Sequence, residues 1–138
     1  MADALRVVDS NVYISGLNFG GLPEAVLRLA QAGAFVLCLS PPIEQETRRI
    51  LAEKFAWAEP DIDRAFRKIR KSAHLVIPAI TLTEAADPDD NRVLECAVTA
   101  QADLIVSGDN DLRRLGRYRD IPILNPRQFL DSEPWRSE

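Results

Sequence analysis

The sequence has few of the residues on which nucleophilic and zinc chemistry most often depends. Its 138 residues include one histidine, His74, and two cysteines, Cys38 and Cys96. His74 stands at an expected junction between a helix and a strand, away from the acidic residues discussed below, so a Ser–His or Cys–His pair has no support. The cysteines lack CxxC spacing and lie in apolar or helical patterns, which indicates buried thiols. P-loop and GxGxxG turns are also missing, which excludes phosphate binding by those devices.

Long hydrophobic runs are absent as well. No run approaches the roughly 20 apolar residues that a membrane-spanning helix needs, and residues 1–10 lack the basic region and apolar core of a signal peptide. We therefore expect a cytoplasmic protein with no membrane partner. A length of 138 residues suits one compact domain, and 46% hydrophobic with 28% charged residues is typical of a soluble globular chain.

Short apolar runs alternate with amphipathic helical patterns along the chain. The expected strands cover 5–8, 34–40, part of 74–82, 102–107 and 121–124. The expected helices cover 11–17, 22–33, 41–55, 61–73 and 87–101, with a short helix or turn at 109–116 and a helical turn from 125. Apolar strands separated by helices indicate a parallel sheet covered on both faces. The fold class is therefore α/β, a single three-layer domain over residues 1–131 with a flexible tail at 132–138.

Two aspartates follow strands of this sheet. Asp9 comes directly after the strand at 5–8, and Asp109 follows the strand at 102–107 with only Gly108 between. Sheets of this type bind ligands at the carboxyl ends of their strands, so both side chains are expected at the ligand-binding edge. Each aspartate alone could equally be a loop residue that caps the next helix.

The helix expected at 41–55, with Ser40 as its N-cap, carries a glutamate at an unusual position. Glu46 lies three residues after Ile43 and four before Ile50, which places it on the predicted core-facing stripe. A buried carboxylate without a partner is costly, so this position indicates a function. The alternatives are a glutamate at the edge of the stripe that reaches solvent, or a pair with Arg49.

Asp90 repeats this pattern on the helix expected at 87–101. It stands three and four residues before Val93 and Leu94, and so faces inward. With Asp87 as N-cap it also falls in the first turn, where carboxylates favour the helix dipole, so helix-start chemistry is an alternative explanation. The neighbouring Asp89 is the alternative candidate for the inward position.

Together the four acids predict a metal site. Two carboxylates 4 Å apart repel each other by about 4 kcal/mol at an effective dielectric near 20. Mg²⁺ or Mn²⁺ would neutralise them and prefers carboxylate oxygen, whereas zinc favours nitrogen and sulfur. The net charge of −4 argues only weakly against a nucleic-acid partner, because the four candidate ligands supply that charge. The predicted ligands are Asp9, Glu46, Asp90 and Asp109.

The order of these motifs resembles that of PIN-domain ribonucleases. VVDSNVYISGL resembles their opening motif, with Ser10 where threonine is usual, and SPPIEQETRRIL resembles the second. DPDDNRVLECAVTAQADLIVSGDNDL resembles the third and fourth, with Ser107 where threonine is common, and IPILNPRQFL also fits. The chain is most similar to the bacterial subgroup described as toxin components of toxin–antitoxin systems, the VapC-type toxins. The resemblance implies a PIN fold, Mg²⁺- or Mn²⁺-dependent cleavage of single-stranded RNA, and a homodimer inhibited by a small antitoxin.

We expect this site to hydrolyse an RNA phosphodiester, with all four acids as catalytic metal ligands and Asp9 at the centre. Asn11 and Ser107 are expected to orient the carboxylates or a water molecule. Asp111 is either an additional outer ligand or a helix cap, and the cap is favoured.

Two basic segments could serve an RNA backbone or a partner. Arg113, Arg114 and Arg117 follow Asp109, together with Arg119, and are candidates for RNA binding, although such runs are commonly solvated faces. The second segment suits an acidic partner or simple solvation; it comprises Arg64, Arg67, Lys68, Arg70 and Lys71. Trp57 and Trp135 could stack bases, but packing or dimer contact is the favoured role.

Two other functions stay open at this point. One is another Mg²⁺-dependent phosphoryl-handling domain, which usually needs a lysine near the acids, and no lysine stands in these motifs. The other is a PIN module that binds or regulates without catalysis, against which the four intact acids argue.

Overall fold

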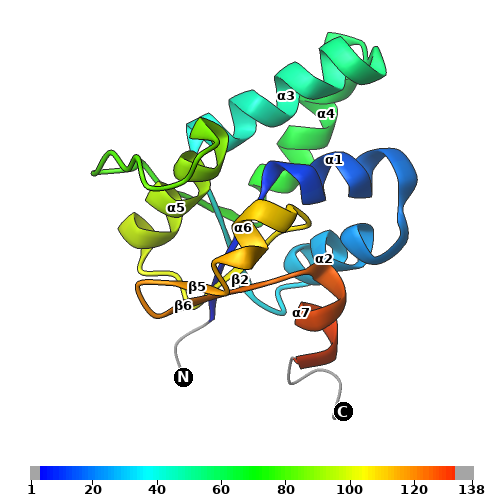
Figure 1. The fold of residues 1–138 in the computed structure, drawn as a ribbon. Coiled ribbons are helices and arrows are strands. Elements are labelled where there is room, and N and C mark those ends of the chain that lie inside the picture. The colour runs from blue at the N-terminus through cyan, green and yellow to red at the C-terminus, as the bar shows by residue number, and fades with distance from the viewer. Residues whose placement is uncertain (1–3, 133–138) are drawn as a thin grey trace.

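A computed structural model describes residues 4–132 as one α/β domain in which a six-stranded sheet is flanked by helices (Figure 1). The strands are β1 Leu5–Val8, β2 Val36–Leu39, β3 Ala73–Leu75, β4 Leu104–Val106, β5 Arg117–Tyr118 and β6 Ile121–Leu124. The helices are α1 Ser10–Phe19, α2 Gly21–Gln31, α3 Pro41–Phe55, α4 Glu59–Arg70, α5 Pro88–Ala100, α6 Asn110–Arg114 and α7 Pro126–Ser132. The predicted α/β class is confirmed.

The strand order β3-β2-β1-β4-β6-β5 places a switch in direction beside β1. Strands β2 and β3 lie on one side of β1, and β4 lies on its other side. The pairs β1–β2, β2–β3 and β1–β4 are all parallel. The centre of this sheet is apolar and fully buried at Val7, Val8 and Ile105. Ligands of such sheets bind where the strand order reverses, so the carboxyl ends of β1 and β4 mark the expected site.

Strand β5 was not predicted from the sequence. It is two residues long and pairs antiparallel with β6 through a tight turn. Arg119 and Asp120 of this turn have φ values of 48° and 68°. Such a turn usually carries asparagine or glycine, so the sequence contains no recognisable hairpin signal here.

The strand expected within 74–82 is shorter than the apolar run. Only Ala73–Leu75 pairs with β2, and Pro78 lacks the N–H that a continuing ladder would need. The chain after β3 is held instead by three side chains that lie four residues apart on α5. They accept main-chain N–H groups in the pairs Ala79–Thr99, Leu82–Glu95 and Ala85–Asn91.

The predicted helix starts are confirmed at Ser40 and Asp87, whose side chains cap α3 and α5. At the end of the chain α7 continues through Ser132, while the rest of the predicted tail, including Trp135, lies outside the described residues. Within residues 4–132, none of the helices combines the length and apolar character required to cross a bilayer.

The buried face of α3 differs from the predicted stripe. Its buried residues are Ile43, Glu44, Thr47 and Leu51. The predicted member Ile50 is only half-buried, and Phe55 is exposed. The stripe is therefore rotated, and the buried glutamate of this helix is Glu44 rather than Glu46.

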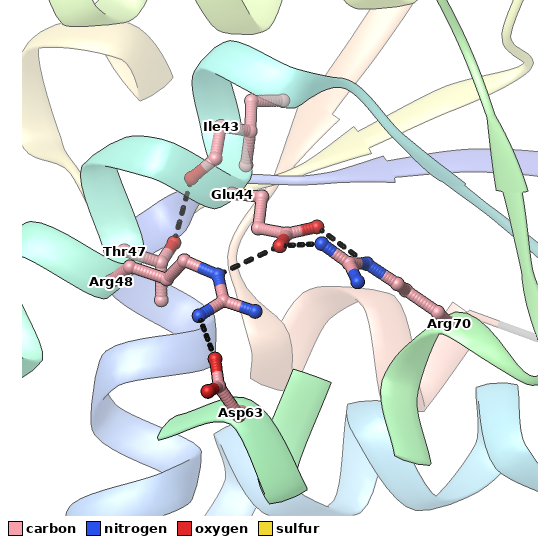
Figure 2. Close-up of polar contacts among 6 residues, drawn as sticks. All are labelled: Ile43, Glu44, Thr47, Arg48, Asp63 and Arg70. Carbon is pink, nitrogen blue, oxygen red and sulfur yellow. Dashed lines mark hydrogen bonds and ion pairs between the residues drawn. The ribbon is translucent and has the colours of Figure 1, made fainter. Parts of the chain in front are cut away.

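Glu44 is neutralised by two arginines, as Figure 2 shows. Arg48 Nε donates to Glu44 Oε2 at 2.8 Å, and Arg70 Nε donates to Oε1 at 3.0 Å, with a second bond from its Nη2. Arg48 also donates to Asp63 on α4 at 2.6 Å. These ion pairs join α3 to α4 and so fix the helix that carries Glu46.

We expect Glu44→Ala to lower the free energy of unfolding by about 2 to 3 kcal/mol, because it leaves two arginines without their buried partner. Glu53→Ala is the matched control on the same helix, since Glu53 pairs with Arg49 at the surface, and its expected cost is below about 0.5 kcal/mol. Urea unfolding measures both. Equal costs for the two variants would contradict a special role for the Glu44 cluster.

Candidate metal centre

Three of the four predicted acids meet at the switch point. Asp9 follows β1, Asp109 precedes α6 after β4, and Asp90 lies in the first turn of α5. Each offers a carboxylate oxygen, and these atoms all lie within 4.8 Å of one another. Asp9 and Asp90 are buried and Asp109 is half-buried, so the charges are concentrated where water is limited.

Asp9 is held by hydroxyl and amide donors. Ser107 Oγ donates to its Oδ2 at 2.7 Å, and Asn11 Nδ2 donates to the same oxygen at 3.1 Å. Asn11 Oδ1 in turn accepts the N–H of Gly108 at 3.0 Å, which ties α1 to the loop after β4. Asn11 and Ser107 thus lie where they can orient the carboxylate, as their predicted role requires.

Asp109 caps the N-terminus of α6 and also belongs to the three-acid group. Its main-chain N–H donates to Ser107 Oγ at 3.0 Å, and its Oδ1 accepts the N–H groups of Asp111 and Leu112. The favoured prediction that Asp111 is a helix cap is therefore wrong, because Asp109 is the N-cap. Asp111 lies in the first turn and pairs with Arg114 at 3.0 Å.

Glu46 lies beside this three-acid group rather than within it. Ser10 Oγ contacts Glu46 Oε1 at 2.5 Å and Asp9 Oδ1 at 3.3 Å, and so links the two acids. The Asp89 carboxyl lies close enough to Glu46 to raise the pKa of that glutamate. The two neighbouring aspartates of α5 are thus divided, with Asp90 in the three-acid group and Asp89 beside Glu46.

The linking role of Ser10 was missed in the sequence. The signal that could have indicated it is the hydroxyl at this position, directly after Asp9. The alternative pairing of Glu46 with Arg49 does not occur, because Arg49 contacts Glu53 at 3.6 Å.

Burial and crowding of like charges raise the pKa values of these acids. Burial is the largest cause for Asp9, whose pKa is raised further by the charge of Asp109 and lowered by the Ser107 hydrogen bond. Burial followed by the charges of Asp109 and Asp9 raises the pKa of Asp90 to about 7. Burial and the contact with Asp89 raise the pKa of Glu46 to about 8. In each case burial and nearby negative charges disfavour the ionised carboxylate, which raises its pKa.

A hard divalent cation suits this donor set. All three groups offer carboxylate oxygen, the ligand that Mg²⁺ and Mn²⁺ prefer, and these oxygens lie within 4.8 Å of one another. Burial first, and then the charges of the neighbouring carboxylates, raise the pKa values of Asp9 and Asp90, and a bound cation would offset both effects.

The arginines predicted to bind RNA lie next to the acids in sequence and are mostly exposed. Arg114 pairs with Asp111, Arg117 with Asp120, and Arg113 donates to Asn110. Each of these contacts is local, so the side chains can move toward an anionic ligand. Binding of RNA by Arg113, Arg114 and Arg117 stays a prediction.

Other singled-out residues have structural contacts. Trp57 is half-buried against the core and donates to Asn18 Oδ1 at 2.9 Å, in agreement with a packing role. Cys38 and Cys96 are buried free thiols, as predicted. His74 is exposed on β3.

The family model of the PIN domain matches residues 6–111, which include all four predicted acids. The chain belongs to the PIN-domain family. Two solved structures share the PIN fold at low sequence identity. VapBC2 from Rickettsia felis, bound to a DNA fragment from their promoter, matches with a TM-score of 0.62 and 9% identity over 88% of this chain and 98% of the other. PAE2754 from Pyrobaculum aerophilum matches with a TM-score of 0.59 and 14% identity over 93% and 88%.

The chain has no match among curated protein sequences. The solved structures therefore support the fold of this PIN domain, and the acidic residues indicate its capacity to bind a cation.

We expect the metal-free PIN domain to lose stability as pH rises from about 5 to 8. In this range the folded protein retains protons on Asp90 and Glu46, with pKa values of about 7 and 8, that the unfolded chain releases near 3.8 and 4.5. The free energy of unfolding therefore falls with increasing pH. Thermal unfolding in EDTA measures it.

In the same measurement Asp90→Asn should flatten the pH dependence, and Asp120→Asn, at an exposed hairpin position, should not. A pH-independent melting temperature in the unsubstituted protein would contradict the mutual repulsion of these acids.

Proposed function

We propose that this PIN domain is a Mg²⁺- or Mn²⁺-dependent endoribonuclease that hydrolyses single-stranded RNA, and that it acts in the cytoplasm as the toxin of a toxin–antitoxin pair. The observation that carries the enzymatic part is the meeting of Asp9, Asp90 and Asp109 within 4.8 Å at the switch point of the sheet. Buried acids that repel one another are costly for a fold to maintain, so their presence supports metal binding.

Asp9, Asp90 and Asp109 would hold the ion, with Asp9 as the central ligand. Glu46 would lie beside this group, linked to Asp9 through the Ser10 hydroxyl. When bound, the ion lowers the pKa of a water ligand and stabilises negative charge on the attacked phosphate. Ser107 and Asn11 keep the Asp9 carboxylate in position by their bonds to Oδ2. Glu46, with a pKa raised to about 8, can hold a proton near neutral pH and give it to a departing oxygen.

The proposed toxin role and partners come from the shared fold and from the resemblance to VapC-type toxins. The fold is shared with a VapBC2 complex bound to promoter DNA, which supports a proposed antitoxin partner for this chain. We propose a homodimer on the resemblance to VapC-type toxins. RNA is the proposed substrate, with Arg113, Arg114 and Arg117 as backbone contacts.

We expect Asp9→Asn to reduce cleavage of a single-stranded RNA by about 100-fold or more in Mg²⁺ or Mn²⁺, because the substitution removes the central ligand. Asp120→Asn is the control, since it removes an equal charge from an exposed hairpin. Cleavage is followed by gel electrophoresis with a single-stranded DNA of the same sequence in parallel, and metal binding by calorimetry. Equal RNA cleavage by both variants would refute the proposal.

We expect Ser107→Ala to lower metal affinity or activity by about 10- to 100-fold, because the Asp9 carboxylate and the Asp109 N–H both lose their shared partner. Ser72→Ala removes a hydroxyl that bonds only to a main-chain carbonyl of α4 and should leave both quantities unchanged. Calorimetric titration with Mn²⁺ measures the affinity. An unchanged affinity in Ser107→Ala would show that this hydroxyl does not position the acids.

A further inference from the structure

A hollow of about 270 Å³ opens directly beside the three-acid group. Asp90 contributes to both, so a molecule held in the hollow adjoins the proposed ion site. One wall is the loop 84–87 before α5, and the other is formed by Asp111, Leu112, Arg114 and Leu115 around α6. Its volume is near the lower end of small-molecule pockets, which begin at about 300 Å³.

Both walls are held in place by contacts with residues next to the acids. Asn91, which follows Asp90 and is itself buried, bonds to the N–H and the carbonyl of Ala85 at 2.9 and 3.2 Å. Glu84 is bonded to the Tyr118 hydroxyl of the β5–β6 hairpin. The opposite wall begins at Asp109, which caps α6. The hollow is therefore formed before any ligand enters.

The lining of the hollow combines apolar side chains with charged ones, among them the buried carboxylate of Asp90. Leu112 and Leu115 form one apolar side, and Ala85 and Ala86 form the other. The rim has three carboxylates, Glu84, Asp87 and Asp111, against one cation, Arg114. In the described part of the chain, each of these carboxylates accepts a hydrogen bond through one oxygen, from Tyr118, the Asp89 N–H or Arg114, and the other oxygen can accept from a ligand.

This chemistry favours a nucleobase over a phosphate. The excess of carboxylates repels a phosphate, whereas the flat apolar faces of a base can lie between the leucine and alanine walls. An exocyclic amino group, as in cytosine, adenine or guanine, can donate to the rim carboxylates. Uracil presents only carbonyl oxygens outside its ring, and these would face acceptors.

We propose that this hollow binds the base of the nucleotide adjoining the cut phosphodiester and prefers a base with an exocyclic amino group to uracil. The proposal rests on the proposed ribonuclease function, because it names a specificity site for that reaction. Leu115 and Ala86 would contact the two faces of the base, and Asp111 is one of the acceptors that would determine the preference for an amino group.

A binding experiment tests this proposal without requiring cleavage. Cytidine and uridine differ by one amino group in place of one carbonyl, and neither carries a phosphate that could bind elsewhere. In the full chain, cytidine should shift the methyl resonances of Leu112 and Leu115 and bind about fivefold more tightly than uridine. Leu115→Ala removes one apolar wall and Ala86→Ile fills the hollow, so each should weaken cytidine binding about fivefold. Leu75→Ala, at another exposed leucine, should leave binding unchanged.

Absence of cytidine shifts at these leucines, equal affinity for both nucleosides, or unchanged binding in both wall variants would each overturn the proposal. All three substituted wall and control positions are at least partly exposed, so the variants are expected to fold.

A cleavage experiment separates this proposal from the proposed function. Two single-stranded RNAs differ only by cytidine or uridine next to the cut, and the unsubstituted protein should cut the cytidine RNA about fivefold faster. Asp111→Asn and Leu115→Ala should bring this ratio toward one. Cleavage of both RNAs at equal rates would overturn the base pocket and leave the ribonuclease standing. Cleavage of neither would overturn the ribonuclease, and the nucleoside titration would then decide on the pocket alone.

Discussion

The parallel pairing of β1 with β4 is the contact on which the candidate site depends. Val8 pairs with Val106, and the N–H of Asp9 continues the ladder by donating to the Val106 carbonyl at 2.9 Å. This pairing brings Asp9 to Ser107, which lies 98 residues further along the chain. Because buried apolar strands enforce the register, a shift by one residue would turn Asp9 into the core and is strongly disfavoured. The apolar core therefore fixes the carboxylates in spite of their repulsion.

That repulsion is a cost that the fold limits without removing it. Ser107, Asn11 and Ser10 donate hydrogen bonds that favour the charged form of Asp9, yet burial outweighs them and its pKa stays raised. The site is thus prepared for positive charge before any cation arrives. A cation that binds only the folded protein would add stability according to its concentration and affinity, so metal binding would be coupled to folding.

Most of the fold and the position of the site could be predicted from local patterns. The apolar strands, the caps Ser40 and Asp87, and the strand-end acids all carry signals within a few residues of themselves. The turn of β5 was missed because Arg119 and Asp120 adopt left-handed backbone without the usual residues. The face of α3 was misassigned because the ion pair that decides it joins Glu44 to Arg70, which is 26 residues away. Such long-range pairing leaves no periodic trace in the sequence.

Consecutive positions at the start of α5 divide the acids into two sets with different chemistry. Asp89 and Asp90 point in directions about 100° apart around the helix axis, so one turn supplies both sets. Asp90 joins two other aspartates, whereas Asp89 lies beside Glu46 and raises the pKa of that glutamate. A cation at Glu46 would have to displace a proton near neutral pH, because the pKa of Glu46 is raised to about 8, whereas the first set offers three carboxylate oxygens within 4.8 Å of one another. The three-acid group is for this reason the proposed cation site, and Glu46 is proposed to handle a proton rather than to serve as an equal fourth ligand.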